Sequence, residues 1–178
     1  MEEEKISATI LLYGEIDEET TPDVLTGLLQ LEDDPDFPVG SEINIYICTP
    51  GGCAYNMFAI YDTIRRLNNQ GYLVITHATG RAMSAGSLLL AAGVKGKRTI
   101  GKNARVMIHS ISGENVGFVS ALQSDLSEIK SIQEQFVGAL VSESKLSSRQ
   151  LKRMIGRNVN VYFSAEEAVK FGIADLIT

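Results

Sequence analysis

The sequence predicts an α/β protein built around a mostly parallel sheet, and two observations support this fold class. Short apolar or β-branched runs alternate along the chain with segments whose apolar residues recur every three or four positions. Such alternation favours parallel strands joined by right-handed crossovers. The length of 178 residues suffices for one well-filled core and is short for two independent domains. We therefore expect a single domain over residues 1–178.

The first half of the chain contains three expected strands and two expected helices. The strands are the apolar runs at residues 8–13, 43–47 and 73–77. Gly80 is expected to end the third strand, because glycine interrupts regular structure. The acidic residues 17–19 and Pro22 open the first helix, since both favour an initial helical turn. The second helix covers residues 54–68, where apolar side chains recur at helical spacing.

The second half begins with a short helix and a strand and continues with one long helix. An Ala/Leu-rich helix is expected at residues 84–92, closed by Gly93, and a strand at residues 104–108. Residues 116–144 read as one amphipathic helix with an apolar stripe. At 1.5 Å per residue it would be about 40 Å long, so part of it must project from a small domain. Because a projecting stripe stays wet in a monomer, we expect its burial against another subunit.

Two capping patterns define the C-terminal helices. Ser147 is expected to cap a short basic helix that ends near Ile155. The segment from Ser164 to Glu167 is a capping box that starts the last helix, and Gly172 ends that helix.

The charge and hydropathy pattern excludes several classes of protein. The chain has 16 basic and 22 acidic residues, a net charge of −6, and no basic stripe interleaved with aromatics. Nucleic acid is therefore not an expected partner. No eighteen apolar residues run together, and the charged residues 1–5 are unlike a signal peptide. We expect a cytoplasmic protein that does not cross a membrane.

Neither a metal nor a nucleotide cofactor is expected. Cys48 and Cys53 lack the two-residue gap of a zinc clip, and only His77 and His109 could add imidazole ligands. Without a secretory signal the two cysteines are better interpreted as reduced thiols. The segment before Gly96 and Lys97 also lacks the glycine and the following Ser/Thr of a phosphate-binding loop.

Ser84 is the candidate nucleophile. It stands among the small residues Ala82, Ala85 and Gly86, where the third strand gives way to a helix. A hydroxyl at a helix N-terminus faces unpaired backbone N–H groups, which stabilise negative charge developing beside it. The alternative is a structural serine that only caps a buried helix.

Gly52 and His109 complete the candidate site. Gly51 and Gly52 follow a strand, and a glycine pair there lets backbone N–H groups approach a substrate; the alternative is a simple tight turn. His109 stands at a strand end, whereas His77 lies inside an apolar run, so His109 is the preferred base. In parallel sheets, sites gather beyond the carboxyl ends of strands, where these residues fall.

Motifs along nearly the whole chain carry a resemblance to a known family. They are Tyr46, TPGG at 49–52, AIYDT at 59–63, GRAMSAG at 80–86, GVKGKR at 93–98, RVMIH at 105–109, SAEEA at 164–168 and FGIAD at 171–175. In this order they resemble the proteolytic subunit of the Clp protease. The resemblance implies a crotonase-like α/β fold of repeated β-β-α units and a serine-peptidase mechanism. It further implies a handle region at about residues 110–145 between two stacked seven-membered rings, and delivery of unfolded polypeptides by a partner ATPase.

The resemblance also assigns roles to individual residues. Ser84 matches the nucleophile and His109 the general base, while the N–H groups of Gly52 and Ala85 match the oxyanion hole. The third triad member of the family is an aspartate, and Asn160 stands in its place here. In chymotrypsin the same replacement favours the wrong histidine tautomer and lowers turnover about ten-thousandfold. Asn160 is therefore the third expected site residue, and three alternatives remain open: it orients His109, another acid substitutes for it, or the chain is slow.

Three functions remain open from the sequence. The first is a peptidase subunit of a self-compartmentalising homo-oligomer that cleaves unfolded polypeptides and short peptides. The second is a catalytically weak structural subunit of a mixed ring, which Asn160 favours. The third is a crotonase-type acyl-CoA enzyme, which would share the fold and the oxyanion turns without needing Ser84 and His109.

Weak coupling to a Clp ATPase is a further expectation. The family carries N-terminal loops around an axial pore, whereas here the first strand is expected by residues 6–8, which leaves a minimal gate. Tyr46 is retained among the positions that dock the ATPase, but Asn44, Arg66 and Thr99 stand where aromatic residues are usual. Val159 likewise replaces an arginine that pairs across the ring interface in the family.

Overall fold

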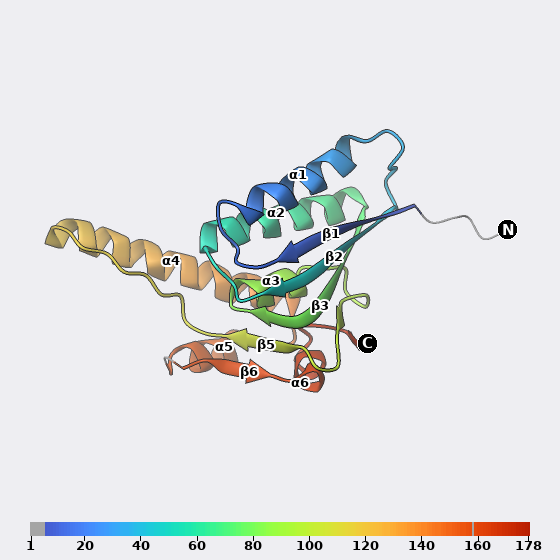
Figure 1. Ribbon diagram of the computed structural model, residues 1–178. Helices are drawn as coiled ribbons and strands as arrows, with labels where there is room; N and C mark the ends of the chain where they lie inside the picture. Colours follow the sequence, from blue (N-terminus) through green and yellow to red (C-terminus); the bar gives the residue numbers. More distant parts are fainter. Residues whose placement is uncertain (1–5, 158) are drawn as a thin grey trace.

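The computed structural model describes residues 6–157 and 159–178 of the chain. Figure 1 shows strands β1 to β3 beneath helices α1 and α2, with helix α4 reaching away from this body. The charged N-terminal residues 1–5, considered above as an unlikely signal peptide, and Asn158 lie outside the described residues.

Parallel pairing dominates the sheet, which confirms the predicted fold class. The order is β1-β2-β3-β4-β7 with parallel neighbours throughout, β5 pairs in parallel with β3, and β6 pairs antiparallel with β5. Within the described ranges the strands are β1 (Ser7–Tyr13), β2 (Glu42–Thr49), β3 (Leu73–Met83), β4 (Thr99–Ile100), β5 (Arg105–Ile108), β6 (Val161–Phe163) and β7 (Leu176–Ile177).

Strand β3 differs from the expectation that Gly80 would end it. The strand runs on to Met83, and Gly80 adopts a φ of 68°, which a glycine tolerates without ending the ladder. The pairing register with β2 shifts between Ile47 and Thr49, so the strand is irregular here instead of broken. On the side away from β2, its middle residues His77 and Ala78 pair with β4 and its last residues 81–83 pair with β5. One strand thus joins three ladders and delivers its carboxyl end to the site.

The helices agree closely with the sequence predictions. They are α1 (Thr20–Asp33), α2 (Ala54–Gln70), α3 (Ala85–Ala91), α4 (Val119–Glu143), α5 (Ser148–Ile155) and α6 (Ala165–Lys170). Both capping predictions are confirmed, because Ser147 forms a capping box with Gln150 and Ser164 forms one with Glu167. The β-α order repeats as far as α3, and the β-β-α order occurs once, where β4 and β5 precede α4.

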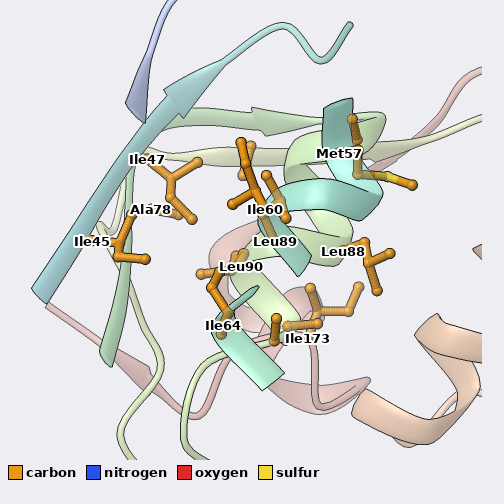
Figure 2. Packing of buried hydrophobic residues seen from close by; sticks show 14 of the residues in the cluster. Ile45, Ile47, Met57, Ile60, Ile64, Ala78, Leu88, Leu89, Leu90 and Ile173 are labelled. Atoms are coloured by element: carbon orange, nitrogen blue, oxygen red, sulfur yellow. The ribbon is translucent and has the colours of Figure 1, made fainter. Parts of the chain in front are cut away.

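The core lies on one face of the sheet, under α1, α2 and α3. Figure 2 shows side chains of β2 and β3 meeting those of α2 and α3, with Ile173 closing the far end. The residues labelled there are Ile45, Ile47, Met57, Ile60, Ile64, Ala78, Leu88, Leu89, Leu90 and Ile173, all buried. Buried residues alternate with more exposed ones along β2, so the opposite face of the sheet is more open. Leu11, Tyr13 and Tyr46 are exposed.

An ion pair between a buried arginine and a partly buried aspartate ties the C-terminal segment to the helices. The guanidinium of Arg98, 4% exposed, donates to both carboxylate oxygens of Asp175, through Nη2 to Oδ1 at 2.7 Å and through Nε to Oδ2 at 2.8 Å. Its Nη1 donates to the carbonyl oxygens of Ala91 (3.0 Å) and Glu143 (2.6 Å). Burial alone would raise the pKa of Asp175, but the hydrogen bonds and charge of Arg98 hold that pKa below its ordinary value.

Helix α4 is anchored at one end only. Its C-terminal half packs into the protein through Ile132, Phe136 and Leu140, all buried. Its N-terminal half leaves Val119 and Leu126 exposed, at 73% and 51%. Figure 1 shows this half extending beyond the sheet and the other helices, with the loop that precedes it alongside, as the sequence predicted. None of the helices in residues 6–157 and 159–178 has the length and apolarity required to span a membrane.

Candidate active site

Ser84 stands at a sharp turn between β3 and α3. It is the only residue other than glycine with a positive φ (53°) in the described part of the chain, and its ψ is −118°. Its N–H donates to the carbonyl oxygen of Met107 at 2.7 Å. Its hydroxyl makes no capping bond to α3, unlike those of Ser147 and Ser164 at their helices. The strained backbone instead turns the hydroxyl out toward another partner.

The partner of Ser84 is His109. This histidine follows β5, and its Nε2 lies 2.8 Å from the Oγ of Ser84. The pair forms because β5 lies beside the last residues of β3, which places the two strand ends next to each other. A hydroxyl hydrogen-bonded to a neutral imidazole is the arrangement required for general-base activation of a nucleophile.

His77 occupies a different environment. Its Nδ1 lies 2.8 Å from the Oγ1 of Thr99 and its Nε2 lies 2.9 Å from the Oδ1 of Asn44, while its ring stacks on Tyr46. Burial lowers the pKa of His77 and so favours the neutral ring. Of the two histidines in the chain, the one whose ring contacts Ser84 is His109.

The glycine pair lets the turn after β2 approach the serine. A Cβ at Gly51 would lie 2.6 Å from the Cβ of Ser84, and Gly51 also has a φ of 103°. A Cβ at Gly52 would lie 2.2 Å from the carbonyl oxygen of Ile16. Any side chain at either position would therefore push backbone segments apart. The close approach, more than the tightness of the turn, explains why two glycines are needed.

Two backbone N–H groups remain available beside the serine. Ile16 donates to the carbonyl oxygen of Gly51 and accepts from the N–H of Cys53, both at 2.8 Å, which fixes the turn. Within residues 6–157 and 159–178, no hydrogen bond uses the N–H of Gly52 or of Ala85. Unpaired donors next to a nucleophile can stabilise an oxyanion.

Asn160 does not hydrogen-bond to His109. Its Nδ2 donates to the hydroxyl of Tyr162 at 3.3 Å, and the residue is exposed just before β6. Asn160, Val159 and His109 line a hollow of about 280 Å³. The sequence-predicted third site residue is thus near the histidine but is bound to a different partner.

A cleft of about 370 Å³ opens in front of Ser84 and His109. Helix α4 forms one wall of it with Asp125, Glu128 and Ile129, which the sequence analysis did not select. The available signal was their spacing, because residues three and four apart share one helical face. Within the described residues, no three His, Cys, Asp or Glu side chains are grouped to hold a metal ion.

Residues 4–178 match the family model described as Clp protease. The chain belongs to the Clp protease family. A curated relative, the ATP-dependent Clp protease proteolytic subunit 4 of Rhodococcus jostii (strain RHA1), is 34% identical over 168 residues, which cover 94% of this chain and 82% of the relative. The resemblance stated from the sequence motifs is confirmed, and membership in the Clp protease family supports a serine-peptidase subunit as the function of this chain.

Proposed function

We propose that this chain is a single-domain serine endopeptidase subunit of a self-compartmentalising Clp protease, and that it cleaves unfolded polypeptides and short peptides. The observation that carries the proposal is the 2.8 Å contact between Ser84 Oγ and His109 Nε2, beside the free N–H groups of Gly52 and Ala85. The sharp turn at Ser84 supports the same conclusion, because strained backbone is retained mainly where function requires it.

In the proposed reaction His109 acts first as base and then as acid. Its Nε2 takes the proton of Ser84 as Oγ attacks the carbonyl carbon of the scissile peptide bond. The N–H groups of Gly52 and Ala85 bind the oxyanion of the tetrahedral intermediate. The imidazolium then protonates the leaving amine, which departs as the C–N bond breaks. His109 then takes a proton from a water molecule as that water attacks the acyl-enzyme carbonyl. The C–O bond to Ser84 breaks, the acid product leaves, and the imidazolium returns its proton to Ser84 Oγ.

Covalent labelling tests the proposal. A serine-directed fluorophosphonate should label the native protein at Ser84, and fluorogenic peptides should be hydrolysed without any nucleotide. Mass spectrometry of the labelled peptide identifies the modified residue. Absence of both labelling and hydrolysis would reject the proposal.

A catalytically weak structural subunit of a mixed ring is the second candidate, and the position of Asn160 favours it. An amide hydrogen-bonded to Tyr162 does not supply the negative charge that would orient His109 and stabilise its imidazolium. An acyl-CoA enzyme of crotonase type is disfavoured by the family match, although we propose that the fold itself is crotonase-like.

Replacement of Asn160 by aspartate should raise the peptidase activity. Asn160→Asp places a carboxylate across the hollow from His109, and we expect kcat/KM for a short peptide to rise at least about tenfold. Asn160→Ala is the matched control: if the native amide already orients His109, this variant is slower than the native protein. An aspartate variant no faster than the native protein would show that Asn160 is not a weakened triad residue.

The exposed half of α4 supports the proposal that the handle region lies between two stacked seven-membered rings. Val119 and Leu126 leave apolar surface in contact with water in the single chain, and a second copy would cover it. In the family an arginine pairs across the ring interface, but Val159 stands at its position here. The rings of this chain would therefore be held together by other contacts.

Leu126→Lys should therefore dissociate the assembly, because it places a charge in the apolar contact. Sedimentation velocity of native protein should show a large oligomer, and the variant a smaller species of unchanged fold. Gln123→Lys adds the same charge on the same helix at a residue outside the apolar stripe and should leave the assembly intact. A native monomer at micromolar concentration would contradict the handle proposal.

Weak coupling to a Clp ATPase is supported by polar groups on the sheet and on the helices. Asn44 on β2 and Thr99 on β4 hydrogen-bond His77. Arg66 on α2 forms an ion pair with Glu32 on α1. These positions present polar groups where a docking peptide would need apolar area. We place the subunit in the cytoplasm, with which the free thiols of Cys48 and Cys53 are compatible.

Reconstitution checks the coupling. With a standard Clp ATPase we expect peptide hydrolysis that does not depend on ATP, and no degradation of a folded, tagged protein. A proteolytic subunit that couples with the same ATPase serves as the positive control. Robust ATP-dependent degradation by this chain would show the prediction to be wrong.

A further inference from the structure

The cleft in front of Ser84 has an apolar floor and an acidic rim. Ile111, Ile129 and Ile132 contribute apolar surface, and Ile132 is 6% exposed. The carboxylates of Glu114, Asp125 and Glu128 line the same cleft. Among the described residues that line it there is no lysine or arginine. The space beside the reacting atoms therefore carries several negative charges without a cation to balance them.

Two of these carboxylates are held by neighbouring side chains. The hydroxyl of Tyr55, on α2, donates to Oε1 of Glu128 at 3.1 Å, and Asn115 donates through Nδ2 to Oδ2 of Asp125. The hydrogen bond to Glu128 raises the pKa of Tyr55, which keeps the phenol protonated as a donor. Each bond uses one oxygen, so Oδ1 of Asp125 and Oε2 of Glu128 have no hydrogen-bond partner among the described residues.

Asp125 and Glu128 are three positions apart on α4, so they share one face of the helix and repel each other. A cationic side chain between them would remove this repulsion and donate hydrogen bonds to both free oxygens. Lysine and arginine combine an apolar stem with a cationic tip, and they place the stem on apolar surface while the tip reaches polar groups. That combination matches a cleft with isoleucines at its floor and carboxylates at its rim. A leucine side chain would contact only the isoleucines and leave the carboxylates without a partner.

We propose that Asp125 and Glu128 select substrates with a lysine or arginine side chain next to the scissile bond. This inference rests on the proposed function and specifies the substrate class of the same cleft. Asp125 and Glu128 are specificity residues: they contact the substrate side chain and take no part in the proton transfers of Ser84 and His109.

The test compares fluorogenic peptides that differ only in the residue before the cleaved bond. We expect kcat/KM for the arginine peptide to exceed that for the leucine peptide at least about tenfold, as hydrogen bonds to charged groups allow. Asp125→Asn and Glu128→Gln should each lower this ratio several-fold, as should added salt. Asp62→Asn removes one negative charge from the exposed face of α2, outside the cleft, and should leave the ratio unchanged. A native protein that cleaves the leucine peptide better would overturn the inference while leaving the peptidase proposal intact.

A binding measurement gives a result that does not depend on catalysis. Fluorescence anisotropy on the Ser84→Ala protein should show tighter binding of the arginine peptide than of the leucine peptide. The double variant Asp125→Asn/Glu128→Gln in the same background should remove the difference. If the native protein cleaves nothing but the binding preference is present, the proposed peptidase function fails and the selectivity stands. Equal binding of the two peptides would reject the selectivity.

Discussion

Ser84→Ala should lower kcat/KM for peptide cleavage by about 10⁴-fold or more and abolish fluorophosphonate labelling, with the fold unchanged. The size of the effect follows from the loss of the hydroxyl oxygen that contacts His109 Nε2 at 2.8 Å. The N–H groups of Gly52 and Ala85 remain, so a small residual rate over water is expected. Peptide hydrolysis, intact-protein mass spectrometry and circular dichroism together measure these three outcomes.

Ser148→Ala provides the matched control for this variant. Ser148 is exposed at the start of α5 and does not line the cleft. The same hydroxyl deletion there should leave both cleavage and labelling at native levels. Undiminished cleavage by pure Ser84→Ala protein would remove Ser84 from the proposed mechanism.

Asp175→Asn should destabilise the fold by about 3–5 kcal/mol, the usual cost of leaving one member of a buried ion pair alone. Arg98 is only 4% exposed and would lose the charge that balances it, while its bonds to two carbonyl oxygens keep it in place. Urea unfolding at fixed protein concentration measures the loss. Glu134→Gln is the control, because its pair with Lys152 is exposed on both sides, and little change is expected.

The pH dependence of stability gives the same pair a second signature. Since the folded-state pKa of Asp175 lies below its ordinary value, the pair stabilises the native protein above the unfolded-state pKa of about 3.9. This stabilisation is lost as the pH falls through the folded-state pKa. The native protein should therefore lose stability between neutral and strongly acidic pH by more than Asp175→Asn does. Parallel pH profiles for the two proteins would contradict a stabilising role for the pair.

Local patterns along the chain were sufficient to predict most of the fold. The capping boxes at Ser147 and Ser164 depend on residues three positions apart, so the sequence displays them directly. The continuation of β3 past Gly80 depends instead on pairing with β2 and β5, which are distant in sequence. The strands β4, β6 and β7 have two or three residues each, too few for a periodic pattern, and exist through their partners.

The candidate site likewise has residues that the local sequence could predict and residues that depend on the packing of distant segments. Ser84 and Gly52 could be selected because small residues and glycines mark the turns that hold them. The turn of Asn160 toward Tyr162 and the entry of Glu128 into the cleft arise from how β6 and α4 pack, which no local pattern encodes. The resemblance assigned Asn160 to the third position of the triad, beside His109, whereas in the structure its side chain is hydrogen-bonded to Tyr162.

The one-sided anchoring of α4 links assembly to substrate affinity. Asp125, Glu128 and Ile129 form a wall of the cleft, yet they precede the buried segment that begins near Ile132. A second copy bound at the exposed stripe, as proposed above, would contact the same segment of α4 that lines the cleft, and would therefore change the free energy of substrate binding there. Thermodynamic reciprocity then requires an occupied cleft to strengthen the contact along the stripe by the same factor. Bound substrate would thus shift the equilibrium between separate subunits and oligomer toward the oligomer, which would be more stable with peptide in its clefts than without.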